Sequence, residues 1–158
     1  MSLARTWSVG LVGVQGAMVE VEVDLAPGVP TVVLVGLPDA VVRQSVDRVR
    51  AAVVNSGCEF PLRRVTIGLS PAAMPKQGSG FDLALAVAVL AAARVLPAAR
   101  VGDLVLLGEL GLARGADADL VAAGDQFAIQ AVLRRVHGTP AAALVNALLL
   151  RAQARATY

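Results

Sequence analysis

One loop of the sequence, residues 71–82, holds side chains that could do nucleophilic chemistry. Lys76 and Ser79 stand three positions apart in it. A serine–lysine dyad requires the amine within hydrogen-bond reach of the hydroxyl and an apolar pocket that lowers the pKa of the amine. Short loops rarely turn two such side chains inward, so we expect a solvated Lys76 and a turn at Ser79 and Gly80. A peptidase built on Ser79 and Lys76 is the alternative.

The same loop is also a candidate for anion binding. Gly78, Ser79 and Gly80 precede a predicted helix, whose first amides and dipole favour an anion. We expect the carboxylate of Asp82 to cap that helix, which argues against an anion there. If the loop contacts an anion or a partner, the candidate residues are Lys76, Gly78, Ser79 and Gly80.

A nucleotide-binding P-loop is not predicted. That motif is glycine, four residues and then Gly-Lys-Ser/Thr, so that backbone amides wrap the phosphates and the lysine reaches the terminal one. The only lysine, Lys76, follows Pro75. Gly10, Gly13 and Gly16 lie in a predicted hairpin and do not open a helix. We therefore expect no ATP binding by this chain.

Metal and nucleic acid sites are equally unexpected. Cys58 is the only cysteine and His137 the only histidine, so the chain can form neither a disulfide nor a metal site with several such ligands. Basic residues are scattered, and Trp7 and Tyr158 are the only tryptophan and tyrosine. Single-stranded nucleic acid is held by stacking aromatics in a basic groove, and this pattern is missing from the sequence.

The composition predicts a soluble, cytoplasmic protein without membrane contact. Hydrophobic residues are 56% and charged residues 16% of the 158 residues, and the net charge is +2; average proteins have about 25% charged residues. The longest apolar run, residues 83–93, makes a helix of about 16 Å, whereas a membrane span needs about twenty residues. The start of the chain has no apolar run typical of a signal peptide.

The first part of the chain is predicted to be β-structure. Residues 6–14 and 18–25 form an antiparallel hairpin, because valine and acidic residues alternate in the second segment. Gln15 and Gly16 mark its turn. Residues 31–35 are a continuous β-branched run, which suggests a central strand buried on both faces.

Helices and strands then alternate. Asp39 is placed to cap a first helix, which Gly57 ends. Residues 63–69 form the next strand, and Asp82 then begins an almost wholly apolar helix that continues to residue 95. Residues 104–107 form a fifth strand. The apolar side of the first helix consists of Val42, Val46, Val49 and Val53. The order is therefore β-β-β-α-β-α-β.

The amino-acid composition of the sequence changes toward the C-terminus. Residues 113–125 are typical of a loop, and residues 126–136 and 141–156 of two helices rich in alanine, leucine and arginine. We therefore expect a domain of residues 1–112 and a divergent helical tail of residues 113–158. The fold class is α/β, in a two-layer α+β arrangement with C-terminal helices added.

Three motifs occur in order along the first domain. They are Gly-Leu-Pro-Asp at 36–39 with its helix; Asn-Ser-Gly at 55–57 followed by Phe60 and Pro61; and Leu-Ser-Pro-Ala at 69–72, continuing through Pro-Lys-Gln-Gly at 75–78 to Phe-Asp-Leu at 81–83. Together with the hairpin they resemble the amino-terminal domain of the ComM/YifB family of magnesium-chelatase-like AAA+ ATPases. The resemblance covers about residues 4–112.

The resemblance implies the fold of ribosomal protein S5 domain 2, which Lon-type proteases share. In those proteases the matching loop reads Pro-Lys-Asp/Glu-Gly-small-Ser. Aligning Pro75, Lys76 and Gly78 with it places Gly80 at the position of the nucleophile. The protease lysine comes from a later segment, where this chain has its unlike tail. The resemblance therefore does not imply that this chain is a protease.

Full-length members of the family continue into a AAA+ domain and are similar to hexameric helicases that act in DNA uptake. The resemblance thus implies a non-catalytic scaffold or interaction domain, whose partner is a AAA+ domain or another protomer. ATP and magnesium are expected only for the AAA+ domain, and DNA contact only indirectly. We expect a truncated family member; a non-functional fragment is a further alternative.

Overall fold

The computed structural model describes residues 2–13, 15–55 and 58–110. The predicted tail, including its loop at residues 113–125 and its helices at 126–136 and 141–156, lies outside the described residues, as does the helix-ending Gly57.

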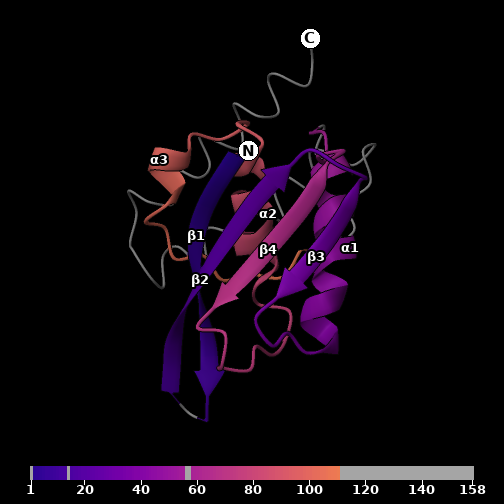
Figure 1. Cartoon of the computed structure of the whole chain (residues 1–158). Helices are drawn as coiled ribbons and strands as arrows, with labels where there is room; N and C mark the ends of the chain where they lie inside the picture. The colour runs from indigo at the N-terminus through magenta and orange to yellow at the C-terminus, as the bar shows by residue number, and fades with distance from the viewer. Residues whose placement is uncertain (1, 14, 56–57, 111–158) are drawn as a thin grey trace.

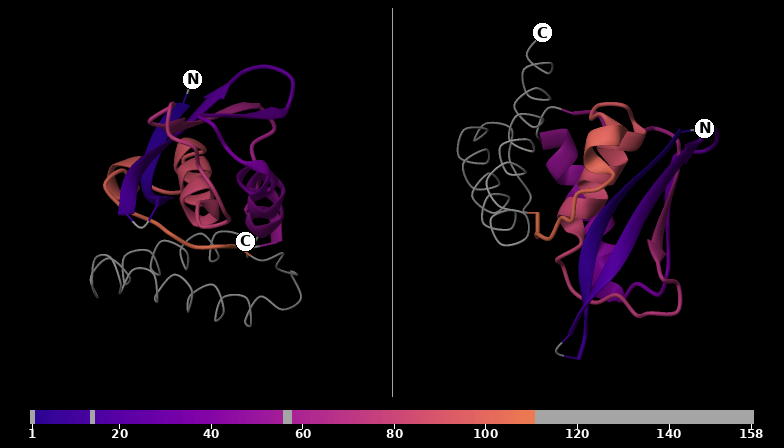
Figure 2. Two further views of the ribbon diagram at one scale, coloured as in Figure 1. Left: turned by 90° about the horizontal axis from the view of Figure 1, so that it is seen from below. Right: turned by 90° about the vertical axis from the view of Figure 1, so that its left-hand side faces the viewer.

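A four-stranded sheet and two helices form the two layers of the fold (Figure 1). The strands are β1 (Ser2–Val12), β2 (Gln15–Ala26), β3 (Thr31–Val35) and β4 (Arg64–Ser70), in the order β1-β2-β4-β3. Figure 2 shows α1 (Ala40–Asn55) and α2 (Asp82–Ala92) together on one face of the sheet. This arrangement confirms the α/β two-layer fold class.

The hairpin of β1 and β2 follows from the alternation in the sequence. Val19, Val21 and Val23 are fully buried against the helices, whereas the acidic residues between them lie on the other face. The predicted turn at Gln15 and Gly16 is wrong, because both residues pair with β1, at Val12 and Leu11. The chain turns instead at Gly13, whose φ of +62° suits glycine.

The predicted central position of β3 is also wrong. β3 lies at the edge of the described sheet, parallel to β4, and α1 supplies the crossover that a parallel pair requires. Val33 and Val35 on its outer face are exposed. β-branched residues indicate that a segment fits a pleated strand, but not whether both faces are covered.

Both predicted helices are present. Asp39 caps α1, since its Oδ1 accepts a hydrogen bond from Val42 N at 2.7 Å, and Val42, Val49 and Val53 are buried. Every residue of α2 is buried, as expected for a helix that is apolar all round. However, α2 ends at Ala92 rather than at residue 95.

The segment after α2 differs from the prediction. A short helix, α3 (Ala98–Val101), was not anticipated. The predicted strand at residues 104–107 is reduced to a single parallel bridge between Val105 and Trp7. Two hydrogen bonds hold it, from Trp7 N to Leu104 O at 3.0 Å and from Leu106 N to Trp7 O at 2.7 Å. Among the helices described, none has the length and apolar content of a membrane span.

Candidate functional site

The loop between β4 and α2 is fixed to the segment that enters α1. Lys76 N donates to Leu37 O at 3.0 Å, and Asp39 N donates to Lys76 O at 3.0 Å. These bonds form a short parallel bridge between Pro38 and Lys76. The backbone of the loop is therefore held in place by the neighbouring connection.

The side chain of Lys76 is completely buried, with an exposed fraction of 0%, so the predicted solvated lysine is wrong. Its Nζ donates a hydrogen bond to Pro71 O within the same loop. Desolvation lowers the pKa of the amine. A signal for this burial exists in the sequence, because Lys76 is the only charged residue between Arg64 and Asp82.

Ser79 has a different partner from Lys76. Its Oγ donates to Glu109 Oε2 at 2.8 Å, whereas the Lys76 amine is bonded to Pro71 O. Glu109 was missed by sequence reasoning, because it lies thirty residues further along the chain. The structure thus brings the two residues into one loop but gives each its own hydrogen-bond acceptor.

The two glycines of the loop form hydrogen bonds through their own backbone groups. Gly78 has a φ of +86°, and its N–H donates to Asp39 Oδ2 at 3.2 Å. Asp39 therefore serves both the cap of α1 and this loop. Gly80 O accepts a hydrogen bond from Gly108 N at 2.9 Å. A Cβ at Gly80 would lie 2.8 Å from Leu107 Cδ1, so any side chain there requires Leu107 to move.

Asp82 does not cap α2, contrary to prediction. The residue before it, Phe81, occupies the cap position and makes no side-chain hydrogen bond there. The carboxylate of Asp82 is fully buried and accepts from Arg48 Nε at 2.7 Å, Arg48 Nη2 at 3.1 Å and Leu110 N at 3.1 Å. The bond to Asp82 raises the pKa of Arg48.

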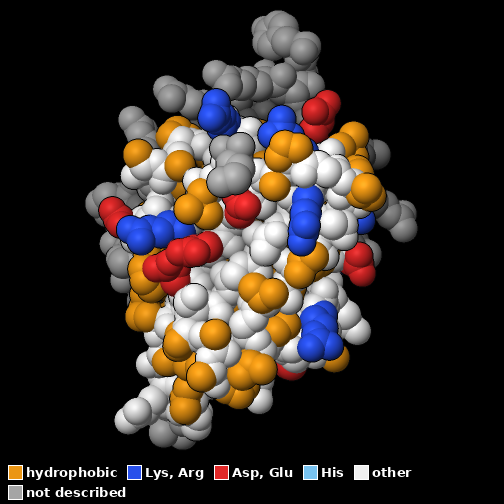
Figure 3. All heavy atoms as spheres, viewed as in Figure 1, with side chains coloured by type: hydrophobic (Ala, Val, Ile, Leu, Met, Phe, Trp, Pro, Cys, Tyr) orange, Lys and Arg blue, Asp and Glu red, His pale blue; other side chains and the backbone are white. Residues whose placement is uncertain are grey.

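The same end of the molecule presents an uncharged surface. We call residues 9–18 the hairpin tip; here β1 and β2 pair only with each other and extend beyond β4, since β2 begins to pair with β4 only at Glu20. Leu11, Val12 and Met18 are exposed by 72%, 54% and 49%. The tip and residues 70–75 contain no charged residue, and Figure 3 shows hydrophobic side chains gathered at this lower end.

The loop lies against the hairpin tip. A Cβ at Gly10 would meet Met74 Cε at 3.2 Å and Phe81 Cζ at 3.6 Å, so the loop approaches the strand where glycine leaves room. Four further loop residues are exposed and uncharged, namely Pro71, Ala72, Ala73 and Pro75. Across the described ranges, no three histidine, cysteine, aspartate or glutamate side chains gather as metal ligands would.

Comparison with known proteins assigns the class. The family described as subunit ChlI of Mg-chelatase matches residues 21–139, which extends past residue 112, where the sequence resemblance was expected to end. An uncharacterized protein of Mycobacterium tuberculosis (strain H37Rv) is 52% identical over 112 residues. YifB of Escherichia coli and competence protein ComM of Haemophilus influenzae are each 42% identical over 112 residues.

The chain therefore belongs to the Mg-chelatase ChlI family, and within it to the ComM/YifB group. Each of these three matches covers 71% of this chain but only 22% of the relative. The chain thus spans about a fifth of the length of the curated relatives it matches.

Proposed function

We propose that this chain is a non-catalytic interaction module of a ComM/YifB-type protein, which packs against another protein of the same family. The partner is either a AAA+ domain or a second copy of the chain. The contact surface is the hairpin tip together with residues 70–75. Exposed apolar patches of this kind mark protein interaction sites.

The observation that carries the proposal is the burial and hydrogen bonding of the Lys76 side chain. Its amine is wholly buried and donates a hydrogen bond to Pro71 O. The lysine therefore links two residues of the same loop and stabilises the conformation of that loop. Ser79 is bonded to Glu109, and Gly80 stands where the related proteases place their serine. The side chains that could do chemistry in this loop are thus engaged in holding its shape.

A second candidate, a serine–lysine peptidase, is favoured by one observation. The pKa of Lys76 is lowered by burial, and a nucleophile is activated by such an amine when the two groups touch. Because Lys76 and Ser79 have separate acceptors, this function would require the loop to rearrange. Covalent labelling of Ser79 with a serine-directed phosphonate distinguishes the two candidates.

Binding through the hairpin tip can be measured by size-exclusion chromatography with light scattering. The 158-residue chain, of 16.1 kDa, is run alone and mixed with full-length YifB. We expect a mass above that of the monomer in at least one of the two runs. The double variant Leu11→Asp/Met18→Asp should run as a monomer in both, because buried charges at an apolar contact are costly.

Val29→Asp is the matched control. Val29 is 81% exposed and lies between β2 and β3, away from the hairpin tip. This variant should associate as the parent chain does. A parent chain that stays monomeric in both runs, or a tip variant that associates like Val29→Asp, would contradict the proposal.

A further inference from the structure

A second surface lies at the other end of the strands, where a groove of about 1040 Å³ opens. It is lined by the start of β1 at Ser2, the end of β2 at Leu25 and the segment after α2 at Arg94. The candidate loop described above follows the end of β4 and precedes α2, so the two surfaces are at opposite ends. This volume is close to the upper limit for small-molecule sites, which are roughly 300–1,000 Å³.

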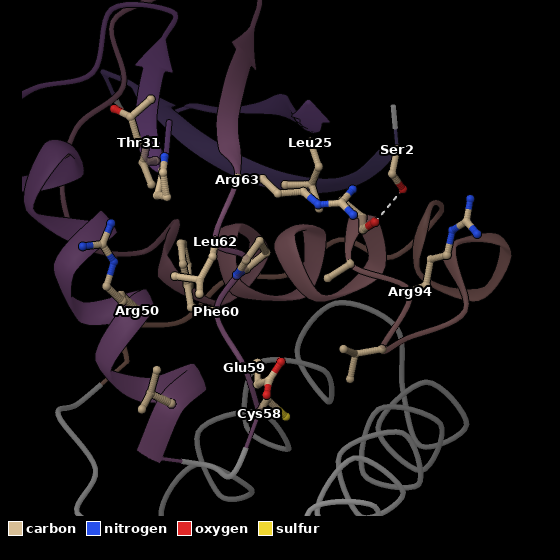
Figure 4. A pocket seen from close by; sticks show the side chains of 17 residues that line it. Ser2, Leu25, Thr31, Arg50, Cys58, Glu59, Phe60, Leu62, Arg63 and Arg94 are labelled. Carbon is tan, nitrogen blue, oxygen red and sulfur yellow. Dashed lines mark hydrogen bonds between the residues drawn. The ribbon is translucent and has the colours of Figure 1, made fainter. Parts of the chain in front are cut away.

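Three arginines from three separate segments of the described chain line this groove. They are Arg50 on α1, Arg63 immediately before β4 and Arg94 after α2. All three are exposed, and none forms a salt bridge with another residue of the described ranges. In Figure 4, Arg63 and Arg94 are drawn toward the end marked by Ser2, and Arg50 lies at the other end.

The rest of the lining does little to neutralise this charge. Among the described residues that line the groove, Glu59 is the only acidic one. Burial raises the pKa of the Cys58 thiol, so this group stays neutral near pH 7. Leu25, Val32 and Val95 supply apolar walls. A cleft lined by one sign of charge with low-dielectric walls concentrates the field and attracts oppositely charged ligands.

The backbone at Arg94 gives an independent indication. Arg94 has a φ of +62° and follows the last turn of α2, a position where helices commonly place glycine. A side chain other than glycine is strained in this conformation. Arg94 thus combines a strained backbone conformation with a side chain that lines the groove, a combination that is found at binding sites.

Phosphate is the anion that best suits this lining. Guanidinium groups present planar donor forks that match phosphate oxygens and remain charged at every physiological pH. Arg50 also lies over the ring of Phe60, with its Cζ 5.1 Å from the ring centroid. Three guanidinium groups around one cavity exceed what a single phosphate needs. We propose that the groove binds an anion carrying several phosphate groups.

The binding test uses the full chain and isothermal titration at low salt. Tripolyphosphate and a single-stranded oligonucleotide are the two probes, which represent a free oligophosphate and a phosphodiester backbone. We expect at least one probe to bind, and binding to weaken with added salt. Arg63→Ala and Arg94→Ala should each reduce the affinity about tenfold or more, since each removes a charge-assisted contact.

Arg43→Ala and Arg64→Ala are controls of equal charge change, because neither residue lines the groove. They should bind within about twofold of the parent, which is the variation expected without a direct contact. The stronger of the two probes identifies the source of the phosphates. Failure of both probes to bind, or equal weakening by the control variants, would overturn the proposal.

Arg94→Gly separates a role in binding from a role in the fold. This variant should raise the midpoint of thermal unfolding, because glycine relieves the left-handed conformation, and it should still lose affinity for the probe. A variant that is more stable and binds as the parent does would show that Arg94 has no part in binding.

Discussion

Lys76 shows how the setting of one residue decides its role. It is the only lysine in the chain and the only charged residue between Arg64 and Asp82, and its side chain is fully buried. The hydrogen bond to Pro71 O supplies one acceptor for its three donors. Such an amine costs stability when protonated, because its charge is removed from water.

The titration of Lys76 can be followed directly. Chain labelled with ¹³C only in lysine gives a single set of ε-carbon signals, and we expect its midpoint in the folded chain to lie below the ordinary value of about 10.4, in the direction given by burial. The same chain unfolded in urea should titrate near the ordinary value. A folded midpoint at or above the unfolded one would show that burial does not destabilise the charged form of the amine.

This shift also sets the pH dependence of stability. Because the folded pKa is the lower one, the unfolded chain binds more protons between the two pKa values. The contribution of Lys76 to the free energy of unfolding therefore rises with pH through that window. The variant Lys76→Met should lack this rise.

Residue roles set by neighbours in the sequence could be predicted, whereas those set by distant residues could not. The cap by Asp39 was predictable because the aspartate directly precedes a run of helical spacing. Asp82 was assigned the same role on the same grounds, but Arg48, which is thirty-four residues away, holds its carboxylate instead. Glu109 was missed as the partner of Ser79 for the same reason.

At the scale of elements, one ion pair connects the two helices. The Arg48 side chain on α1, 20% exposed, reaches the fully buried carboxylate of Asp82 at the start of α2. Arg48 Nη2 also donates to Ser45 Oγ at 2.9 Å and to Val41 O at 3.1 Å. This network fixes the position of α2, and therefore of the loop before it, relative to α1.

Removing Arg48 should destabilise the fold strongly. In the described part of the chain, Arg48→Ala leaves the buried Asp82 carboxylate with one donor, Leu110 N, and breaking a buried pair costs about 3 kcal/mol or more. Urea unfolding measures the loss. Arg43→Ala, an exposed arginine on the same helix, should change stability by about 0.5 kcal/mol or less. Similar midpoints for the two variants would rule out this role for the pair.

The elements themselves were largely predictable, and their arrangement was not. The alternation of apolar and acidic residues in β2 and the continuous run of apolar residues in α2 are local patterns. Both correctly predicted which side chains of these elements are buried. The edge position of β3 depends on β4, which follows thirty residues later, so the β-branched run alone could not show it. The bridge at Val105 likewise depends on pairing with Trp7, near the other end of the domain.

At the scale of the whole molecule, the described domain has two dissimilar ends. One carries the uncharged hairpin tip and the closed loop around Lys76. The other carries the groove with its three arginines. We infer that a protein partner binds at the first end and a phosphate-bearing ligand at the second, so that both could be bound at the same time.

Labelling of Ser79 tests the central claim, that the loop at residues 71–82 is structural and not catalytic. The full chain is treated with a serine-directed phosphonate, and the adduct is located by mass spectrometry of peptides, in parallel with Lys76→Ala. Our account predicts no adduct on Ser79 in either protein. An adduct on Ser79 of the parent chain that is lost in Lys76→Ala would contradict it.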